Sequence, residues 1–66
     1  MNAAKYPNPL DPAVAQWADE LNDADLEWFN ERAGIFEFDA GLSRAEAEQQ
    51  AREATVLMQL RRNAAI

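Results

Sequence analysis

The sequence predicts an all-α fold: a compact three-helix domain, residues 11–66, preceded by an extended N-terminal arm, residues 1–10. Three observations predict it. Apolar stripes at three- and four-residue spacing follow clear helix start signals. No segment alternates convincingly between apolar and polar residues, as a half-buried strand would. The turns between the helical segments are very short, so the three helices must pack in an antiparallel or orthogonal arrangement.

The arm ends where the first helix, expected over residues 12–21, begins. Prolines restrict the residues before them to extended backbone and prevent an uninterrupted helix: Pro7, Pro9 and Pro12. Asp11 is a favoured N-cap, and the residue after it is a proline at the first helical position, where the missing N–H costs nothing. The apolar stripe that follows consists of Val14, Trp17, Ala18 and Leu21.

The second helix is expected over residues 23–39. Asn22 can cap it, with Asp25 at the third helical position. Leu21 and Leu26 have the spacing of a hydrophobic staple across this cap. Gly41 can supply the left-handed residue that ends the helix.

The third helix is expected over residues 44–62, opening with the capping box Ser43-x-x-Glu46. Its inward stripe is expected to be Ala47, Ala51, Ala54 and Met58. Near its end, apolar residues cover more than one face: Val56, Leu57, Met58 and Leu60. A helix that is apolar all round is usually buried, so this end should contact the first helix, the arm or a second chain.

The second helix carries two apolar faces, nearly opposite each other. One face consists of Leu26, Phe29, Ala33 and Phe36. The other consists of Trp28, Ile35 and Phe38. Either this helix is central and each face meets a neighbour, or the second face stays partly exposed and forms a dimer or partner interface with Glu27 and Glu31 at its rim.

Composition excludes most catalytic chemistry. The chain has no cysteine and no histidine, so it lacks thiolate ligands, the commonest general base and the commonest transition-metal ligand. The paired acids Glu27 and Glu31 are expected to be solvated surface. Gly34 and Gly41 are too far apart for a phosphate loop, and Gly34 would serve a close helix approach or a bend. We expect no enzyme, no cofactor and no metal site.

Charge is unevenly distributed along the chain, whose formal net charge is −6. Residues 11–39 hold nine acids and one base, a net −8, whereas residues 40–66 hold three acids and four arginines, a net +1. Direct binding to nucleic acid is therefore disfavoured. The N-terminus lacks a signal-peptide core and no apolar run could span a bilayer, so a soluble, cytoplasmic protein without membrane partners is expected.

One segment has a recognisable pattern. Residues 28–48 contain Glu-Arg-Ala at 31–33, Glu-Phe-Asp at 37–39, Gly-Leu at 41–42 and Ser-Arg-Ala-Glu-Ala-Glu at 43–48. This pattern, about a third of the chain, resembles a helical segment of small uncharacterised proteins of proteobacterial phages, plasmids and integrative elements. Similar segments occur as appendages of their primase- and helicase-type replication proteins. The resemblance implies a mobile-element setting and carries over no catalytic residue.

Together these features predict a non-enzymatic protein-binding module or accessory protein of a phage or mobile element, acting through an apolar helical face on a protein partner or on itself as a homodimer. Two alternatives stay open. One is an acidic inhibitor, or DNA mimic, that blocks a nucleic-acid-binding protein. The weaker one is a small transcriptional regulator whose third helix presents its arginines to DNA: Arg44, Arg52, Arg61 and Arg62.

Overall fold

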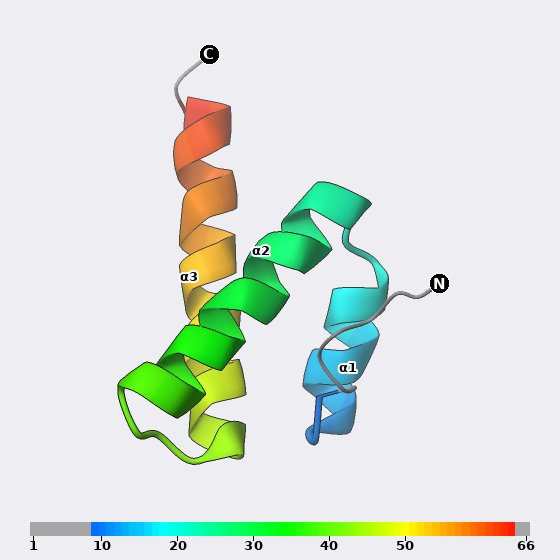
Figure 1. Cartoon of the computed structure of the whole chain (residues 1–66). Helices are drawn as coiled ribbons and strands as arrows, with labels where there is room; N and C mark the ends of the chain where they lie inside the picture. The colour runs from blue at the N-terminus through cyan, green and yellow to red at the C-terminus, as the bar shows by residue number, and fades with distance from the viewer. Residues whose placement is uncertain (1–8, 65–66) are drawn as a thin grey trace.

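The computed structural model describes residues 9–64. Over these residues the chain forms α1 (Pro12–Asp19), α2 (Asp23–Gly34), the π-helical turn η1 (Ile35–Asp39), which continues α2 directly, and α3 (Arg44–Ala64). Figure 1 shows α2 crossing α3 obliquely, with the C-terminal turns of α3 projecting past the crossing. The predicted all-α, three-helix fold is confirmed, whereas most of the predicted arm, residues 1–10, lies outside the described residues.

The first two helices begin at the predicted caps. The Asp11 carboxylate accepts the backbone N–H of Ala13 at 2.8 Å, and the Asn22 side chain accepts that of Asp25 at 2.8 Å. Both caps have extended backbone, which turns the chain abruptly into each helix. Each cap satisfies one of the amide groups that the first helical turn leaves without an intrahelical acceptor.

The third helix begins at the predicted capping box. Ser43 Oγ accepts the backbone N–H of Glu46 at 3.2 Å, and the Glu46 carboxylate accepts the backbone N–H of Ser43 at 3.4 Å. The same carboxylate accepts the Ser43 hydroxyl at 3.1 Å. These reciprocal bonds fix where α3 starts.

Helix α1 ends at Asp19, before the expected end at Leu21. The amides of Glu20 and Leu21 donate to Trp17 and Ala18, at 3.2 and 3.1 Å. These bonds span three residues instead of four, so the last turn tightens and the α-helical ladder stops.

The second helix was expected to stay α-helical to Asp39, but its last turn is a π-helix. The Ala40 amide donates to the Ile35 carbonyl, five residues back, at 3.2 Å. Gly41 then takes the predicted left-handed conformation, with φ of 75°, and the amide after it donates to the Phe36 carbonyl at 3.1 Å. The wider turn and the glycine together reverse the chain toward α3.

Gly34 occupies the junction between α2 and η1, with ordinary helical angles of φ −62° and ψ −43°. Apart from its chain neighbours and the backbone of its own helix, a Cβ built at this position would meet no atom within 4 Å. No neighbouring helix approaches this position, so Gly34 does not serve close helix packing, which was one of its two expected roles.

The core lies where the three helices meet. Its buried cluster consists of Val14, Ala18, Phe29, Ala33 and Ala51. Partly buried side chains pack against it: Trp17, Leu21, Leu26 and Phe36. The rings of Trp17 and Phe29 meet edge to face at a centroid distance of 5.3 Å. The expected stripe of the first helix and the first apolar face of the second both build this core.

The inward stripe of α3 differs from the predicted one. Ala47 and Ala51 are buried as expected, but Ala54 and Met58 are only partly buried. Glu48 and Thr55 are enclosed instead. The helix is therefore rotated about its axis relative to the expected orientation.

Hydrogen bonds explain why two polar side chains can take the place of apolar ones. Glu48 accepts the backbone N–H of Leu10 at 2.8 Å and Arg44 Nε at 3.1 Å. Thr55 Oγ1 donates to the Ala51 carbonyl at 2.8 Å. Since a buried polar group is tolerated only when it is hydrogen-bonded, these contacts make the rotation possible.

Candidate functional site

The candidate surface on the second helix, here called the helix-two face, consists of Trp28, Ile35 and Phe38, with Glu27 and Glu31 at its rim. Phe38 is 76% exposed, and Trp28 and Ile35 are half-buried. Both rim acids are exposed. None of the three apolar residues belongs to the core cluster of the described residues or to the side chains packed on it.

The π-helical turn changes the geometry of this face. Trp28 and Ile35 are seven residues apart, so they lie on one side of the helix, two turns apart. Bonds that span five residues underwind a helix, so Phe38 is turned away from the position that α-helical periodicity gives it. The face is therefore a two-residue stripe, Trp28 and Ile35, with a strongly exposed ring offset from it.

Arg32 covers one side of the Trp28 indole. The guanidinium carbon lies 4.4 Å from the ring centroid, a cation–π contact. Trp28 Nε1 and Arg32 Nε are both enclosed, and neither has a hydrogen-bond partner among the described residues. An enclosed donor without an acceptor costs about 1–3 kcal/mol. Both donors are enclosed, so in this arrangement they add a cost to the fold and are not accessible to a partner.

A second apolar surface lies on α3, where the sequence predicted burial. Val56, Leu57 and Leu60 are 37%, 48% and 60% exposed. Figure 1 shows α1 away from the C-terminal turns of α3, so of the three expected coverings the first helix does not apply; most of the arm lies outside the described residues, and a second chain stays a prediction. Helical periodicity explains the exposure of these three residues: because Ala51 and Thr55 face the core, Val56, Leu57 and Leu60 lie on the opposite side of α3. We call them the outer face of α3.

The arginines of α3 do not form a DNA-binding stripe. Arg44 pairs with Glu48, and the Arg52 guanidinium lies 5.7 Å from the Trp17 ring centroid. Arg62 pairs with an acid of α2, described next. Arg61 is exposed. Because three of the four positive side chains contact the chain itself, the arrangement gives no support to the regulator alternative.

A polar cluster joins the start of α2 to the end of α3. The buried Asp25 carboxylate accepts two bonds from the Arg62 guanidinium, both at 3.1 Å, and one from Gln59 Nε2 at 2.9 Å. The hydrogen bonds from Arg62 and Gln59, with the positive charge of Arg62, hold the pKa of this carboxyl below its ordinary value. The sequence placed this acid only as a helix-start residue and gave no signal for its distant partners.

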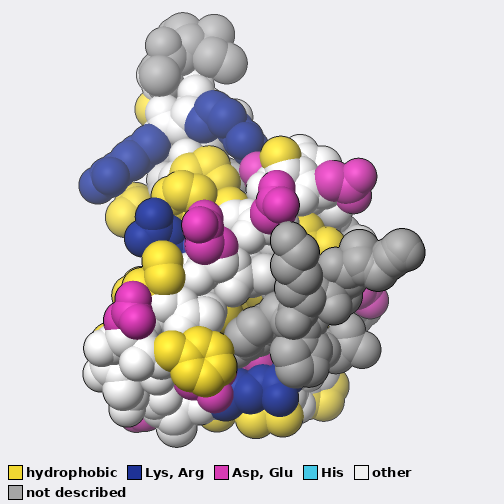
Figure 2. Space-filling view, viewed as in Figure 1, with side chains coloured by type: hydrophobic (Ala, Val, Ile, Leu, Met, Phe, Trp, Pro, Cys, Tyr) yellow, Lys and Arg dark blue, Asp and Glu magenta, His cyan; other side chains and the backbone are white. Residues whose placement is uncertain are grey.

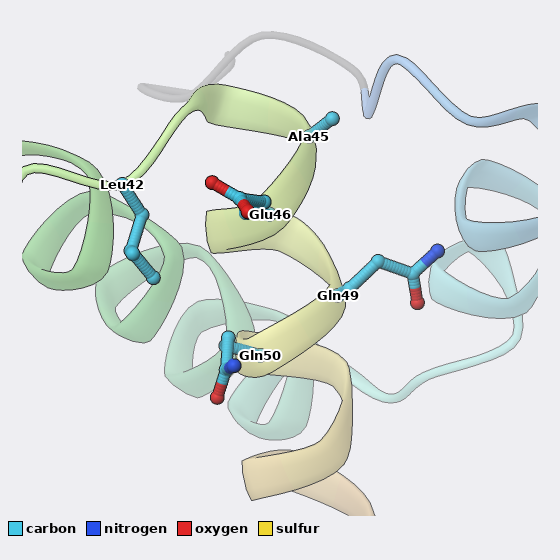
Figure 3. Close-up of a pocket in the computed structure, with 5 residues that line it drawn as sticks. All are labelled: Leu42, Ala45, Glu46, Gln49 and Gln50. Atoms are coloured by element: carbon cyan, nitrogen blue, oxygen red, sulfur yellow. The ribbon is translucent and has the colours of Figure 1, made fainter.

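A shallow hollow of about 250 Å³ lies beside the first turns of α3, lined by Leu42, Ala45, Glu46, Gln49 and Gln50. Figure 3 shows that the two glutamine side chains diverge and do not converge on a common point. Gln49 donates to Asp11 at 3.3 Å, and Glu46 is engaged in the capping box. With these polar groups committed to the fold, the hollow lacks the convergent donors and acceptors of a ligand site.

Across residues 9–64, no three acidic side chains gather in an arrangement suited to a metal ion. In the same part of the chain, no helix combines the length and apolar character that crossing a membrane requires. Comparison with family models, with curated proteins and with solved structures gave no match. The exposed helical surfaces therefore remain the features from which a function can be argued.

Proposed function

We propose that this chain is a small non-enzymatic protein-binding module of a phage or mobile element, which binds its partner through the helix-two face. The observation that carries the proposal is Phe38, an aromatic side chain left 76% exposed at the end of the same helix as the Trp28–Ile35 stripe and offset from it, with all three residues outside the core. Aromatic side chains are enriched in protein interfaces and among the residues that dominate binding energy. The mobile-element setting rests on the resemblance of residues 28–48.

Charge indicates the chemistry of the partner. Glu27 and Glu31 are exposed at the rim, and residues 11–39 carry a net −8. Figure 2 shows acidic side chains along the visible side of α2. A partner with an apolar groove bordered by lysine or arginine would bury the aromatic ring and complement the acids. We therefore propose a protein partner with a basic-rimmed apolar groove.

The test is photo-crosslinking in cells that naturally encode the chain. A photoreactive amino acid replaces Phe38 in one variant and Gln50, an exposed residue of α3, in the control. We expect one discrete protein adduct at position 38 and none at position 50. Ile35→Asp should abolish the adduct while circular dichroism shows that the helices are retained.

Two outcomes would contradict the proposal. The first is an adduct that survives Ile35→Asp in a folded protein. The second is binding that moderate salt abolishes but Phe38→Asp does not affect, because that result is expected of an acidic inhibitor that blocks a nucleic-acid-binding protein.

A further inference from the structure

The outer face of α3 has the spacing of a helix-pairing seam. Leu57, Leu60 and Ala64 follow one another at intervals of three and four residues, the a/d spacing of coiled coils, and Val56 flanks them. All four are exposed. Figure 2 shows hydrophobic side chains between Lys or Arg side chains over the C-terminal half of α3. This surface is separate from the helix-two face, which belongs to α2 and η1.

We propose that the outer face of α3 pairs with the same face of a second copy of this chain, with the two helices antiparallel. In this arrangement Leu57 of each copy packs against Leu60 of the other. The interface is self-complementary about a two-fold axis, as in most homodimers. It goes beyond the proposed function because it uses different residues and a different kind of partner.

Charge favours the second copy as the occupant and antiparallel as the orientation. Glu53 lies one turn before Leu57, in line with the leucines, and Arg61 lies beside Leu60. Both are exposed, and neither has an ion-pair partner among residues 9–64. Antiparallel pairing brings each Glu53 within reach of Arg61 of the second copy. Parallel pairing would set one Glu53 against the other, which is destabilising.

The shape of the molecule leaves room for this pairing. The C-terminal turns of α3 project past its crossing with α2 (Figure 1), and the core lies on the opposite side of α3 from Leu57 and Leu60. In the antiparallel arrangement the two globular parts lie at opposite ends of the paired helices. The seam is short, so we expect a weak dimer, with a dissociation constant on the order of 100 µM.

The first experiment is sedimentation equilibrium of the full chain at low ionic strength, from about 10 µM to about 1 mM. Leu57→Glu and Leu60→Glu should each raise the dissociation constant at least about tenfold, because each places an acid in the seam. Both sites are substantially exposed, so the helical circular dichroism should be unchanged. Phe38→Asp is the matched control: it changes an equally apolar exposed site on the helix-two face and should leave dimerisation unaffected.

The second experiment tests the charges and the orientation. Glu53→Arg and Arg61→Glu should each weaken self-association about three- to tenfold, because each creates like charges across the seam. A mixture of the two variants should recover the affinity of the original chain, because each then offers the charge that the other lacks. The proposal is overturned if the chain stays monomeric at about 1 mM, if Phe38→Asp rather than Leu57→Glu removes the dimer, or if the mixture associates no better than its components.

Discussion

Replacing Gly34 with alanine should stabilise the protein, although this glycine precedes the π-helical turn. Its backbone angles, φ −62° and ψ −43°, are ones that alanine adopts without strain. Apart from its chain neighbours and the backbone of its own helix, the added methyl group would meet no atom within 4 Å, so it creates no clash. The substitution therefore reduces the conformational freedom of the unfolded chain and leaves the native contacts intact.

The expected gain is about 0.5–1 kcal/mol, the usual difference between glycine and alanine inside a helix. For a domain of this size, 1 kcal/mol changes the melting temperature by about 4–8 °C. The measurement is thermal and urea unfolding followed by far-ultraviolet circular dichroism at neutral pH. An increase in the urea midpoint with an unchanged slope would show that only stability has changed.

Gly41→Ala is the matched control, because the same substitution there should have the opposite sign. Gly41 has φ of 75°, where an L side chain costs about 1–2 kcal/mol. If Gly34→Ala lowers the melting temperature as Gly41→Ala does, the reasoning is refuted, and the π-helical turn requires glycine at its start.

Three further predictions concern stability. The pKa of Asp25 lies below its ordinary 3.8, because Arg62 and Gln59 bind its charged form. The stability that this carboxylate contributes should therefore be complete above about pH 5 and lost as pH falls through the lowered pKa. Between about pH 7 and pH 2 the melting temperature should fall less in Asp25→Asn than in the original chain. Ser43→Ala removes the cap of α3 and should cost about 1 kcal/mol in urea unfolding, and an unchanged midpoint would show that the capping box contributes nothing. Phe29→Ala removes the buried ring at the centre of the core and should lower the free energy of unfolding by about 3–5 kcal/mol. Because so small a core supplies about that much stability, this variant should show no cooperative melting transition. Retained cooperative melting would contradict the assigned core.

The helix starts could be predicted from the sequence because capping is local chemistry. Asp11, Asn22 and Ser43 each bind an amide two or three residues away, so the whole interaction is visible in a short stretch of sequence. The same holds for Gly41, whose position just after an apolar helical pattern indicated its left-handed conformation.

The contacts that could not be predicted join distant parts of the chain. The burial of Glu48 depends on two contacts: a local one with Arg44, four residues earlier, and a distant one with the amide of Leu10, 38 residues earlier, which no local pattern indicates. The pairing of Asp25 with Arg62 spans 37 residues. Neither partner could be identified without knowing how α3 is rotated, and the predicted stripe through Ala54 and Met58 had that rotation wrong.

The candidate surfaces were predictable to different degrees. The surplus of apolar residues on the second helix was visible in the sequence, but the offset of Phe38 depends on a π-helical turn for which Gly34 gave only an ambiguous hint. The sequence shows the apolar residues near Leu57 and Leu60, but their exposure among residues 9–64 follows from the packing of whole helices and not from local pattern.

The cluster around Asp25 has a consequence for how the protein unfolds. The backbone amide of Asp25 donates to the Asn22 cap of α2, while the Asp25 carboxylate accepts hydrogen bonds from Gln59 and Arg62 near the C-terminal end of α3. Fraying at the start of α2 therefore disturbs the C-terminal end of α3, and the reverse also holds, because both ends depend on the position of Asp25. Amide protons in the first turn of α2 and in the last turns of α3 should accordingly exchange with solvent together, as a single cooperative unit, although they are remote in sequence.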